Sequence, residues 1–198
     1  MTKTATMSTK QFFIPILTLL LFSSCGKESS IDQKGSPAPQ IIPIPNGDFE
    51  LWDNIILDEW QTNPCTYCVP AFETYVVQKD TDAAHGQFAA KFIYNGVYSS
   101  FANNKFPISL HPTLLTGYIK ANIANGDTAT IHIDLFSGGN IVDIGDYYET
   151  SSVPGYKKIE VPISQSFPSA DSALIKIAGG KKQNTELYVD NLVFLKNN

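Results

Sequence analysis

Acidic residues stand inside two apolar segments that lie far apart in the chain. Glu50 lies between Phe49 and Leu51, and Asp190 lies within the strand-forming run 187–195. A carboxylate in such a segment is costly, because strands disfavour Asp and burial penalises its charge. Carboxylate oxygens are also the ligands that Ca²⁺ prefers. The pattern therefore predicts either a shared cation that ties the two ends of one domain together, or two carboxylates that point to solvent or cap turns.

Cys65 and Cys68 form the one motif with a possible redox role. A thioredoxin-like site needs such a pair at the start of a helix that follows a strand, whereas Pro64 and Pro70 place this pair in a loop. A zinc site needs about four ligands, and the chain has no second cysteine pair. We expect a short-range disulfide that stiffens the loop. Free thiols, or metal or redox chemistry, are the alternatives.

Aromatic residues beside polar or turn residues are candidates for sugar recognition. Sugars bind to aromatic rings that lie flat against their apolar C–H faces, while neighbouring polar groups read the hydroxyls. The alternative for each ring is burial in the core, and for Trp60 burial is favoured over sugar binding. The regions of Tyr98 and Tyr147 rank first, because these rings adjoin turn residues and lack an apolar partner two positions away. The candidates are Trp60, Tyr98, Phe101, Tyr147 and Tyr148.

Composition and periodicity predict the elements that position these residues. The chain has 198 residues, of which 43% are hydrophobic and 17% charged, so we expect one domain with a sizeable core. No segment has a sustained helical period. Short periodic runs separated by turn signals predict an all-β antiparallel β-sandwich. The expected strands are 48–53, 73–79, 87–94, 98–107, 114–122, 127–137, 140–149, 156–163, 172–179 and 185–196.

Two turn signals and the period-two pattern of the last strand make the expected β-sandwich more specific. The Gly138-Gly139 turn predicts a hairpin between the strands on either side of it. The Asn125-Gly126 turn is expected to join the preceding strand to that hairpin. The closing segment alternates at period two, so Asp190 is expected on one face, and the other face carries Leu187, Val189, Val193 and Leu195.

Several short motifs, in this order and spacing, resemble the jelly-roll carbohydrate-binding modules. They are Asn46–Glu50, Trp60, His85–Lys91 and Tyr188–Leu192. With Leu115–Lys120 included, the sequence is also similar to the carbohydrate-metabolism domain of Bacteroidetes lipoproteins. The resemblance covers residues 44–196 and implies a galactose-binding-like jelly roll.

The resemblance also implies a structural calcium held by the early acidic motif and the late aspartate. Matched position by position, it points to the side chains of Glu50 and Asp190 as ligands. Further ligands implied are Asn46 or Asp48 and backbone carbonyls near Gly86.

The N-terminal segment has the features of a lipoprotein signal. Lys10 precedes a short apolar stretch, which is too short for a bilayer of ~30 Å hydrocarbon thickness. Phe22-Ser23-Ser24-Cys25 then resembles a bacterial lipobox, in which Cys25 is acylated; a conventional signal peptide is the alternative. We therefore expect a signal peptide over 1–24, a flexible Pro/Ser-rich linker over 25–40 and the sandwich over 41–198. The expected location is the outer membrane, on the cell surface or the periplasmic face.

Charge excludes one class of partner. All 14 basic residues are lysine and the formal charge is −5, so we expect no nucleic-acid binding.

We expect a lipid-anchored, non-catalytic module that binds an oligosaccharide or polysaccharide. The alternative is a structural surface subunit that contacts protein partners without binding sugar. A small glycoside hydrolase is a further alternative, which would need two facing carboxylates that the sequence does not single out.

Overall fold

The computed structural model describes residues 37–62, 76–94, 96 and 99–197, all within one compact unit that spans 36–198. Every regular element in these ranges is a β-strand. Over the same ranges, no helix has the length and apolar character to cross a membrane. The predicted Cys25, Cys65, Cys68 and Tyr98, together with the signal peptide, lie outside the described residues.

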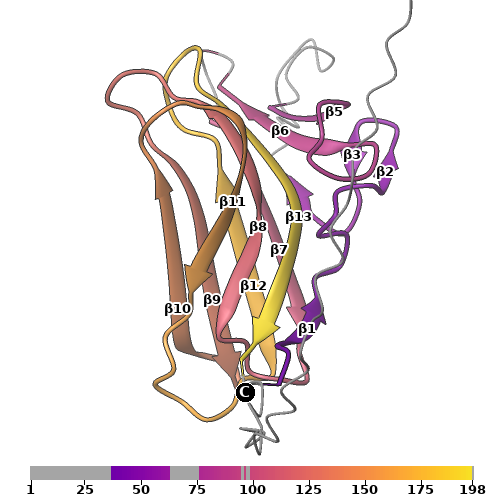
Figure 1. Ribbon diagram of the computed structural model, residues 1–198, viewed down its shortest axis with the longest axis vertical. Helices are drawn as coiled ribbons and strands as arrows, with labels where there is room; N and C mark the ends of the chain where they lie inside the picture. Colours follow the sequence, from indigo (N-terminus) through magenta and orange to yellow (C-terminus); the bar gives the residue numbers. More distant parts are fainter. Residues whose placement is uncertain (1–36, 63–75, 95, 97–98, 198) are drawn as a thin grey trace, which may run out of the picture. The chain divides into compact units, whose positions relative to one another are not determined.

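The strands form two stacked antiparallel sheets with the core between them, as Figure 1 shows. One sheet has five strands in the order β10-β9-β12-β7-β4. Its strands are β4 (Gln61–Thr62), β7 (Phe101–Pro107), β9 (Ala129–Ser137), β10 (Asn140–Glu149) and β12 (Ser172–Ala178). Alternate residues of each strand face inward, so that β9, for example, buries Ile131, Ile133 and Leu135. The predicted β-sandwich is confirmed.

The second sheet has six strands, in the order β11-β8-β13-β6-β5 with β1 also beside β13. Its strands are β1 (Gln40–Pro43), β5 (Val77–Asp80), β6 (Ala89–Ile93), β8 (Leu114–Asn122), β11 (Val153–Pro162) and β13 (Glu186–Lys196). A small hairpin of β2 (Trp52–Asp53) and β3 (Ile56–Leu57) follows β1. Phe92, Leu115 and Phe194 are among the fully buried side chains that this sheet contributes to the core.

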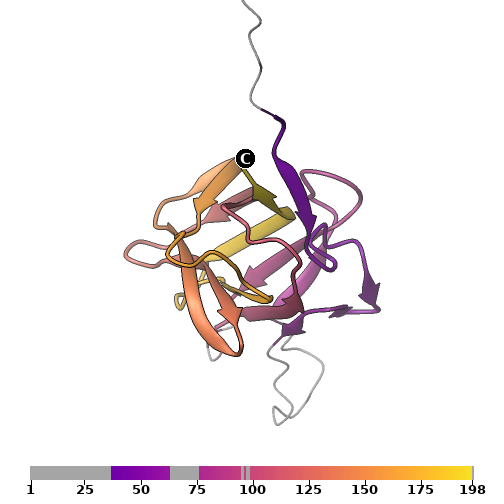
Figure 2. The same cartoon turned by 90° about the horizontal axis from the view of Figure 1, so that it is seen from below.

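Strand β13 organises this sheet and contains a β-bulge. Its first half pairs with β6 and its second half with β1, and β8 runs along its other side. The register shifts between Asp190 and Val193, where Asn191 has a positive φ of 49°. The pairing of β1 with the end of β13 brings the first and last strands of the sandwich together (Figures 1 and 2).

The bulge corrects the predicted alternation. It shifts the phase, so the inward residues are Leu187 and Val189 before it and Leu192 and Phe194 after it. Val193 and Leu195 are only half-buried. Asp190 is completely buried, and it does not lie on a solvent face.

Two further expectations differ from the structure. The hairpin at Gly138-Gly139 forms as β9–β10, but the strand before it, β8, belongs to the other sheet. The Asn125-Gly126 turn therefore carries the chain from one sheet to the other. The expected strand at 48–53 is a loop up to Leu51, and the first strand of the sandwich is instead 40–43, just upstream.

Candidate functional site

The outer face of the five-stranded sheet, which points away from the core, carries two exposed aromatic rings in one cross-strand row. Strand register aligns this row across β10, β9, β12 and β7 as Tyr148, Thr130, Ala178 and Phe101. Tyr148 is 61% exposed and Phe101 is 44% exposed. The outer strands of the row lie about 14 Å apart, from three strand spacings of ~4.8 Å. Two aromatic residues thus flank a strip whose floor is made of the small Thr130 and Ala178.

The next row of the outer face is polar and linked by ion pairs. His132 Nδ1 lies 2.6 Å from the Asp146 carboxylate, and its Nε2 lies 2.8 Å from Asp134. Lys176 donates to the other oxygen of Asp134 at 2.7 Å. Asn103 and Gln61 extend the same row toward the β4 edge.

These contacts set the protonation states of the row. Burial alone would lower the pKa of His132, but its hydrogen bonds to Asp146 and Asp134 and the charges of both outweigh burial and raise the pKa above its usual value. Burial alone would raise the pKa of Asp134, and its bonds to Lys176 and His132 lower it instead. Both ring nitrogens of His132 therefore face carboxylates, which leaves neither as a free base. This row can hydrogen-bond to hydroxyls, but it is not arranged as a catalytic dyad.

A pocket of about 620 Å³ opens at the Tyr148 end of the outer face. We refer to it as the Tyr148 pocket. Its walls come from the segment before β7, the β8–β9 turn, β9, β10, and the end of β12 with the segment after it. They include Asp127, Thr128, Thr130, Tyr148, Ala178 and Lys181.

Two predicted sugar-binding aromatics are not on this face. Trp60 is 4% exposed, packs against Phe49, and donates its indole N–H to the carbonyl of Asn46 at 3.1 Å. Tyr147 points to the opposite side of β10 from Tyr148, packs against the core and donates its hydroxyl to Glu149 at 2.6 Å. The prediction for Trp60 is corrected, because a buried ring cannot stack on a sugar. Tyr147 is half-buried and lies off the outer face, because adjacent strand residues face opposite ways.

Glu50 and Asp190 both hold the loop between β5 and β6. Asp190 Oδ2 accepts the backbone N–H groups of Ala84 and His85 at 2.7 and 2.8 Å. Glu50 Oε1 accepts those of Gln87 and Phe88 at 2.8 and 3.1 Å. We call this arrangement, Glu50 and Asp190 on loop 84–88, the carboxylate clamp. It connects residues from both ends of the domain through a shared loop.

One oxygen of the clamp has no partner. Asp190 Oδ1 is buried and makes no hydrogen bond to any described residue. Burial raises the pKa of Asp190, and the backbone N–H groups of His85, Ala84 and Asn191 only partly oppose it. An orphaned buried carboxylate oxygen is a donor that fits a hard cation. Among the described residues, no group of three or more His, Cys, Asp or Glu is arranged to hold a metal ion, so the remaining ligands at the clamp would be carbonyls or water.

The other two predicted calcium ligands lie on the loop after β1. The Asn46 amide donates to the carbonyls of Leu51 and Asp58 at 2.9 and 2.8 Å, and its oxygen accepts Leu51 N–H. These bonds use the amide to fix its own loop, and its role as a ligand stays a prediction. Asp48 is exposed, and its role stays a prediction.

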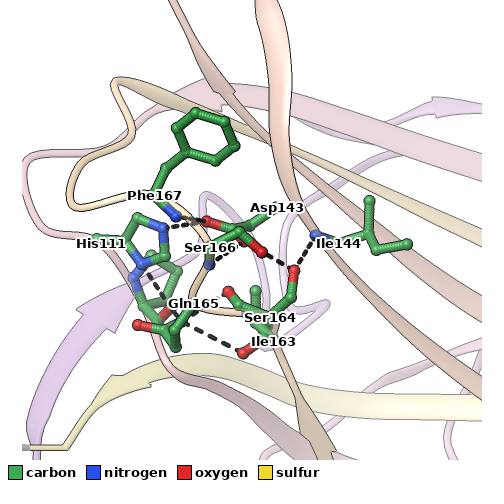
Figure 3. Close-up of polar contacts among 9 residues, drawn as sticks. His111, Asp143, Ile144, Ile163, Ser164, Gln165, Ser166 and Phe167 are labelled. Carbon is green, nitrogen blue, oxygen red and sulfur yellow. Dashed lines mark hydrogen bonds and ion pairs between the residues drawn. The ribbon is translucent and has the colours of Figure 1, made fainter.

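A second buried carboxylate, which sequence reasoning did not single out, lies on β10 (Figure 3). Asp143 Oδ1 accepts Ser164 Oγ at 2.8 Å and Ser166 N–H at 2.7 Å. Its Oδ2 lies 2.9 Å from His111 Nε2 and accepts Phe167 N–H at 3.2 Å. Burial alone would raise the pKa of Asp143, and these bonds hold it below its usual value. The serine contacts the aspartate and not the histidine, so the cluster joins loops and is no nucleophilic triad.

Beyond Tyr148 and Phe101, the sequence did not identify the residues of the strip, the polar row and the Tyr148 pocket. Thr130, Lys176 and Lys181 are ordinary strand and loop residues that match no motif. Strand alternation places His132 with Thr130 on one face of β9. Their neighbours on β10 and β12 depend on sheet order, which the sequence does not give.

No protein-family model matches the chain, and no curated protein matches it significantly. Solved structures do share its fold. A family 61 carbohydrate-binding module in complex with β-1,4-galactotriose is 12% identical and has a TM-score of 0.54, over 78% of this chain and 97% of that one. A family 16 carbohydrate-binding module is 16% identical, with a TM-score of 0.50 over 77% and 99%.

A third structure of the same fold is the enzymatically active domain of tailspike protein 4 from bacteriophage CBA120. It is 13% identical with a TM-score of 0.51, over 77% of this chain and 21% of that one. Identities this low establish the fold alone. The described domain therefore has the jelly-roll β-sandwich fold of carbohydrate-binding modules.

Proposed function

We propose that this protein is a non-catalytic module that binds glycan on the outer face of its five-stranded sheet. The observation that carries the proposal is the row in which exposed Tyr148 and Phe101 flank Thr130 and Ala178. Small side chains between two rings leave room for sugar rings to lie across the strands. Aromatic faces suit the C–H faces of pyranoses.

The polar row beside the strip supplies the hydroxyl-reading groups. Lys176, Asp146 and Asn103 are partly exposed, and the ion pairs of His132 with its two carboxylates hold this row in place. A few fixed polar groups beside an apolar platform are typical of small-molecule sites. The sharing of the fold with modules described as carbohydrate-binding supports the same interpretation.

A glycan-array screen of the full chain, followed by calorimetric titration of the best ligand, tests this function. Tyr148→Ala and Phe101→Ala should each weaken binding by at least about tenfold, since burial of a large apolar side chain contributes about 1.5–3 kcal/mol. Phe167→Ala is the matched control, because Phe167 is 51% exposed on the loop between β11 and β12. Absence of binding to every glycan, or equal losses in all three variants, would disprove the proposal.

We further propose that the carboxylate clamp holds a structural calcium ion through Glu50 and Asp190. The unpartnered Asp190 Oδ1 supports this assignment. Bound there, the ion would neutralise a buried carboxylate and fix loop 84–88. The glycan site lies on the other sheet, so the ion would stabilise the fold without contacting sugar.

We also propose that Cys25 carries a lipid anchor that tethers the domain to the cell envelope, facing either the periplasm or the outside. The lipobox-like Phe22-Ser23-Ser24-Cys25 supports the proposal. Metabolic labelling with a fatty acid should mark the wild-type protein and fail to mark Cys25→Ser. Equal labelling of both would contradict it.

A further inference from the structure

The charged groups of the Tyr148 pocket favour one class of sugar. Asp127 and Lys181 are the charged residues among those that line it. The Asp127 carboxylate is bonded within the protein, whereas the Lys181 ammonium has no partner among the described residues. Only the ammonium is therefore available to a ligand. The class of sugar that this difference favours refines the proposed glycan-binding function and rests on it.

The negative charge of Asp127 is used inside the protein. Asp127 is 8% exposed, and its carboxylate accepts the backbone N–H groups of Lys181 and Lys182 at 2.8–3.0 Å. It also accepts the hydroxyl of Thr185 at 2.6 Å. Burial alone would raise the pKa of Asp127, but these bonds and one from Thr128 N–H hold it below its usual value. A carboxylate with this many donors fixes the β8–β9 turn and has little capacity left for a ligand.

The Lys181 ammonium has no such partner. Within the described ranges it makes no ion pair and no hydrogen bond, although its backbone N–H binds Asp127. The next residue behaves differently, since Lys182 Nζ donates to the carbonyl of Asn125 at 2.7 Å. The ammonium of Lys181 is thus the uncompensated charge at a pocket of a chain whose formal charge is −5.

The polar row next to the pocket adds no free negative charge. Asp146 pairs with His132, and Asp134 pairs with both His132 and Lys176. With His132 protonated, these four residues carry two positive and two negative charges and sum to zero. A ligand that reaches the pocket along the strip therefore meets Lys181 as the unpaired charge.

We propose that the Tyr148 pocket binds an acidic sugar, a pyranose that carries a carboxylate, with the ligand carboxylate at Lys181 Nζ. The Tyr148 ring packs on the apolar face of the sugar, and the hydroxyls of Thr128 and Thr130 supply neutral hydrogen bonds. A charge-assisted bond of this kind is the contact that separates an acidic sugar from its neutral counterpart.

The test compares glycans that differ only in charge. Galacturonate, glucuronate and mannuronate oligosaccharides are titrated into the full chain, each beside its carboxyl-reduced counterpart. At least one acidic member should bind about tenfold tighter than its reduced form, and this preference should shrink as salt is raised. Lys181→Met should abolish the preference, whereas Lys182→Met, which removes the same charge one residue away, should keep it.

The possible failures are distinguishable. Reduced glycans that bind as tightly as acidic ones, or a preference unchanged in Lys181→Met, would overturn the acidic-sugar assignment and leave the glycan-binding function standing. No binding of either class, on this panel and on a neutral glycan array, would overturn both.

Discussion

Two buried aspartates, one in each sheet, differ in how their oxygens are satisfied. Asp143 on β10 is 2% exposed and Asp190 on β13 is 0% exposed. Both Asp143 oxygens are bonded, to donors from the β7–β8 and β11–β12 loops. Asp190 uses one oxygen for two backbone N–H groups and leaves the other without a partner among the described residues.

The difference separates a complete structural cluster from an incomplete one. Buried polar groups in folded proteins nearly always have partners, so an orphan calls for an explanation. The Asp143 cluster needs nothing more, and its protein bonds alone lower the pKa of Asp143. Burial raises the pKa of Asp190 by more than its hydrogen bonds within the protein lower it. A cation at the clamp would supply the missing partner.

The largest expected effect comes from removal of the complete cluster. Asp143→Ala leaves the buried His111 without its acceptor, and it also removes the acceptor of Ser164 and of two backbone N–H groups. We expect a loss of about 3–5 kcal/mol in the free energy of unfolding, measured by urea denaturation. Asp171→Ala is the control, because Asp171 also accepts two hydrogen bonds but is exposed. A loss in Asp143→Ala no larger than in this control would show that the cluster does not stabilise the fold.

The next effect tests the incomplete cluster. Calcium at a hundredfold excess over its Kd should stabilise the wild type by about 2.7 kcal/mol, a rise in Tm of roughly 5–10 °C. Asp190→Asn should abolish the rise, because it removes the charge that the ion pairs with. Asp143→Asn should keep it. A Tm that calcium and chelator leave unchanged in the wild type would mean that the clamp binds no ion.

A pair of glycine substitutions sharpens the role of Glu50. Gly86 and Gly138 have similar positive φ values, 68° and 57°. A Cβ at Gly86 would overlap the Glu50 carboxylate, whereas one at Gly138 meets nothing within 4 Å. We expect Gly138→Ala to cost about 1 kcal/mol from backbone strain alone, and Gly86→Ala about 2 kcal/mol.

The rise in Tm with calcium is expected to differ between the two glycine variants. Gly86→Ala should also reduce the rise in Tm with calcium, while Gly138→Ala should not. Thermal melts with and without the ion give both quantities. Equal costs in the two variants would show that Glu50 does not shape loop 84–88.

The sequence predicted much of the fold because strand alternation is local. The expected strands at 114–122 and 140–149 match β8 and β10 residue for residue. The bulge at Asp190 was missed, since a one-residue insertion changes the phase without changing composition. The crossing from β8 to β9 was also missed, because a Gly turn fits both a hairpin and a change of sheet.

The candidate site was only partly predictable, because it depends on which strands lie side by side and not on local alternation alone. Tyr148 and Phe101 were identified from composition, but their place in one row depends on the order β10-β9-β12-β7. Trp60 and Tyr147 are also aromatic, but the first is buried in the core and the second is half-buried against it, which composition does not reveal. Asp143 and His111 are 32 residues apart and meet only when the loops pack together.

The last prediction is that the two aspartates respond to pH in opposite directions in the presence of chelator. The lowered pKa of Asp143 makes its stabilisation complete above the ordinary value of 3.8 and lost as pH falls toward the lowered value. The pKa of Asp190 is raised, so the folded protein keeps a proton there that the unfolded chain releases above 3.8. Stability from Asp190 therefore falls as pH rises through this range.

Denaturation of each Asp→Asn variant and the wild type across pH 3–7, in chelator, isolates the two contributions as difference curves. Relative to its variant, the wild type should gain stability with pH at Asp143 and lose it at Asp190. Calcium should reverse the Asp190 curve, because the ion favours the ionised form, and should leave the Asp143 curve unchanged. Curves of the same sign in chelator would mean that the Asp190 charge already has a partner within the protein, and the physical basis for a cation at the clamp would be lost.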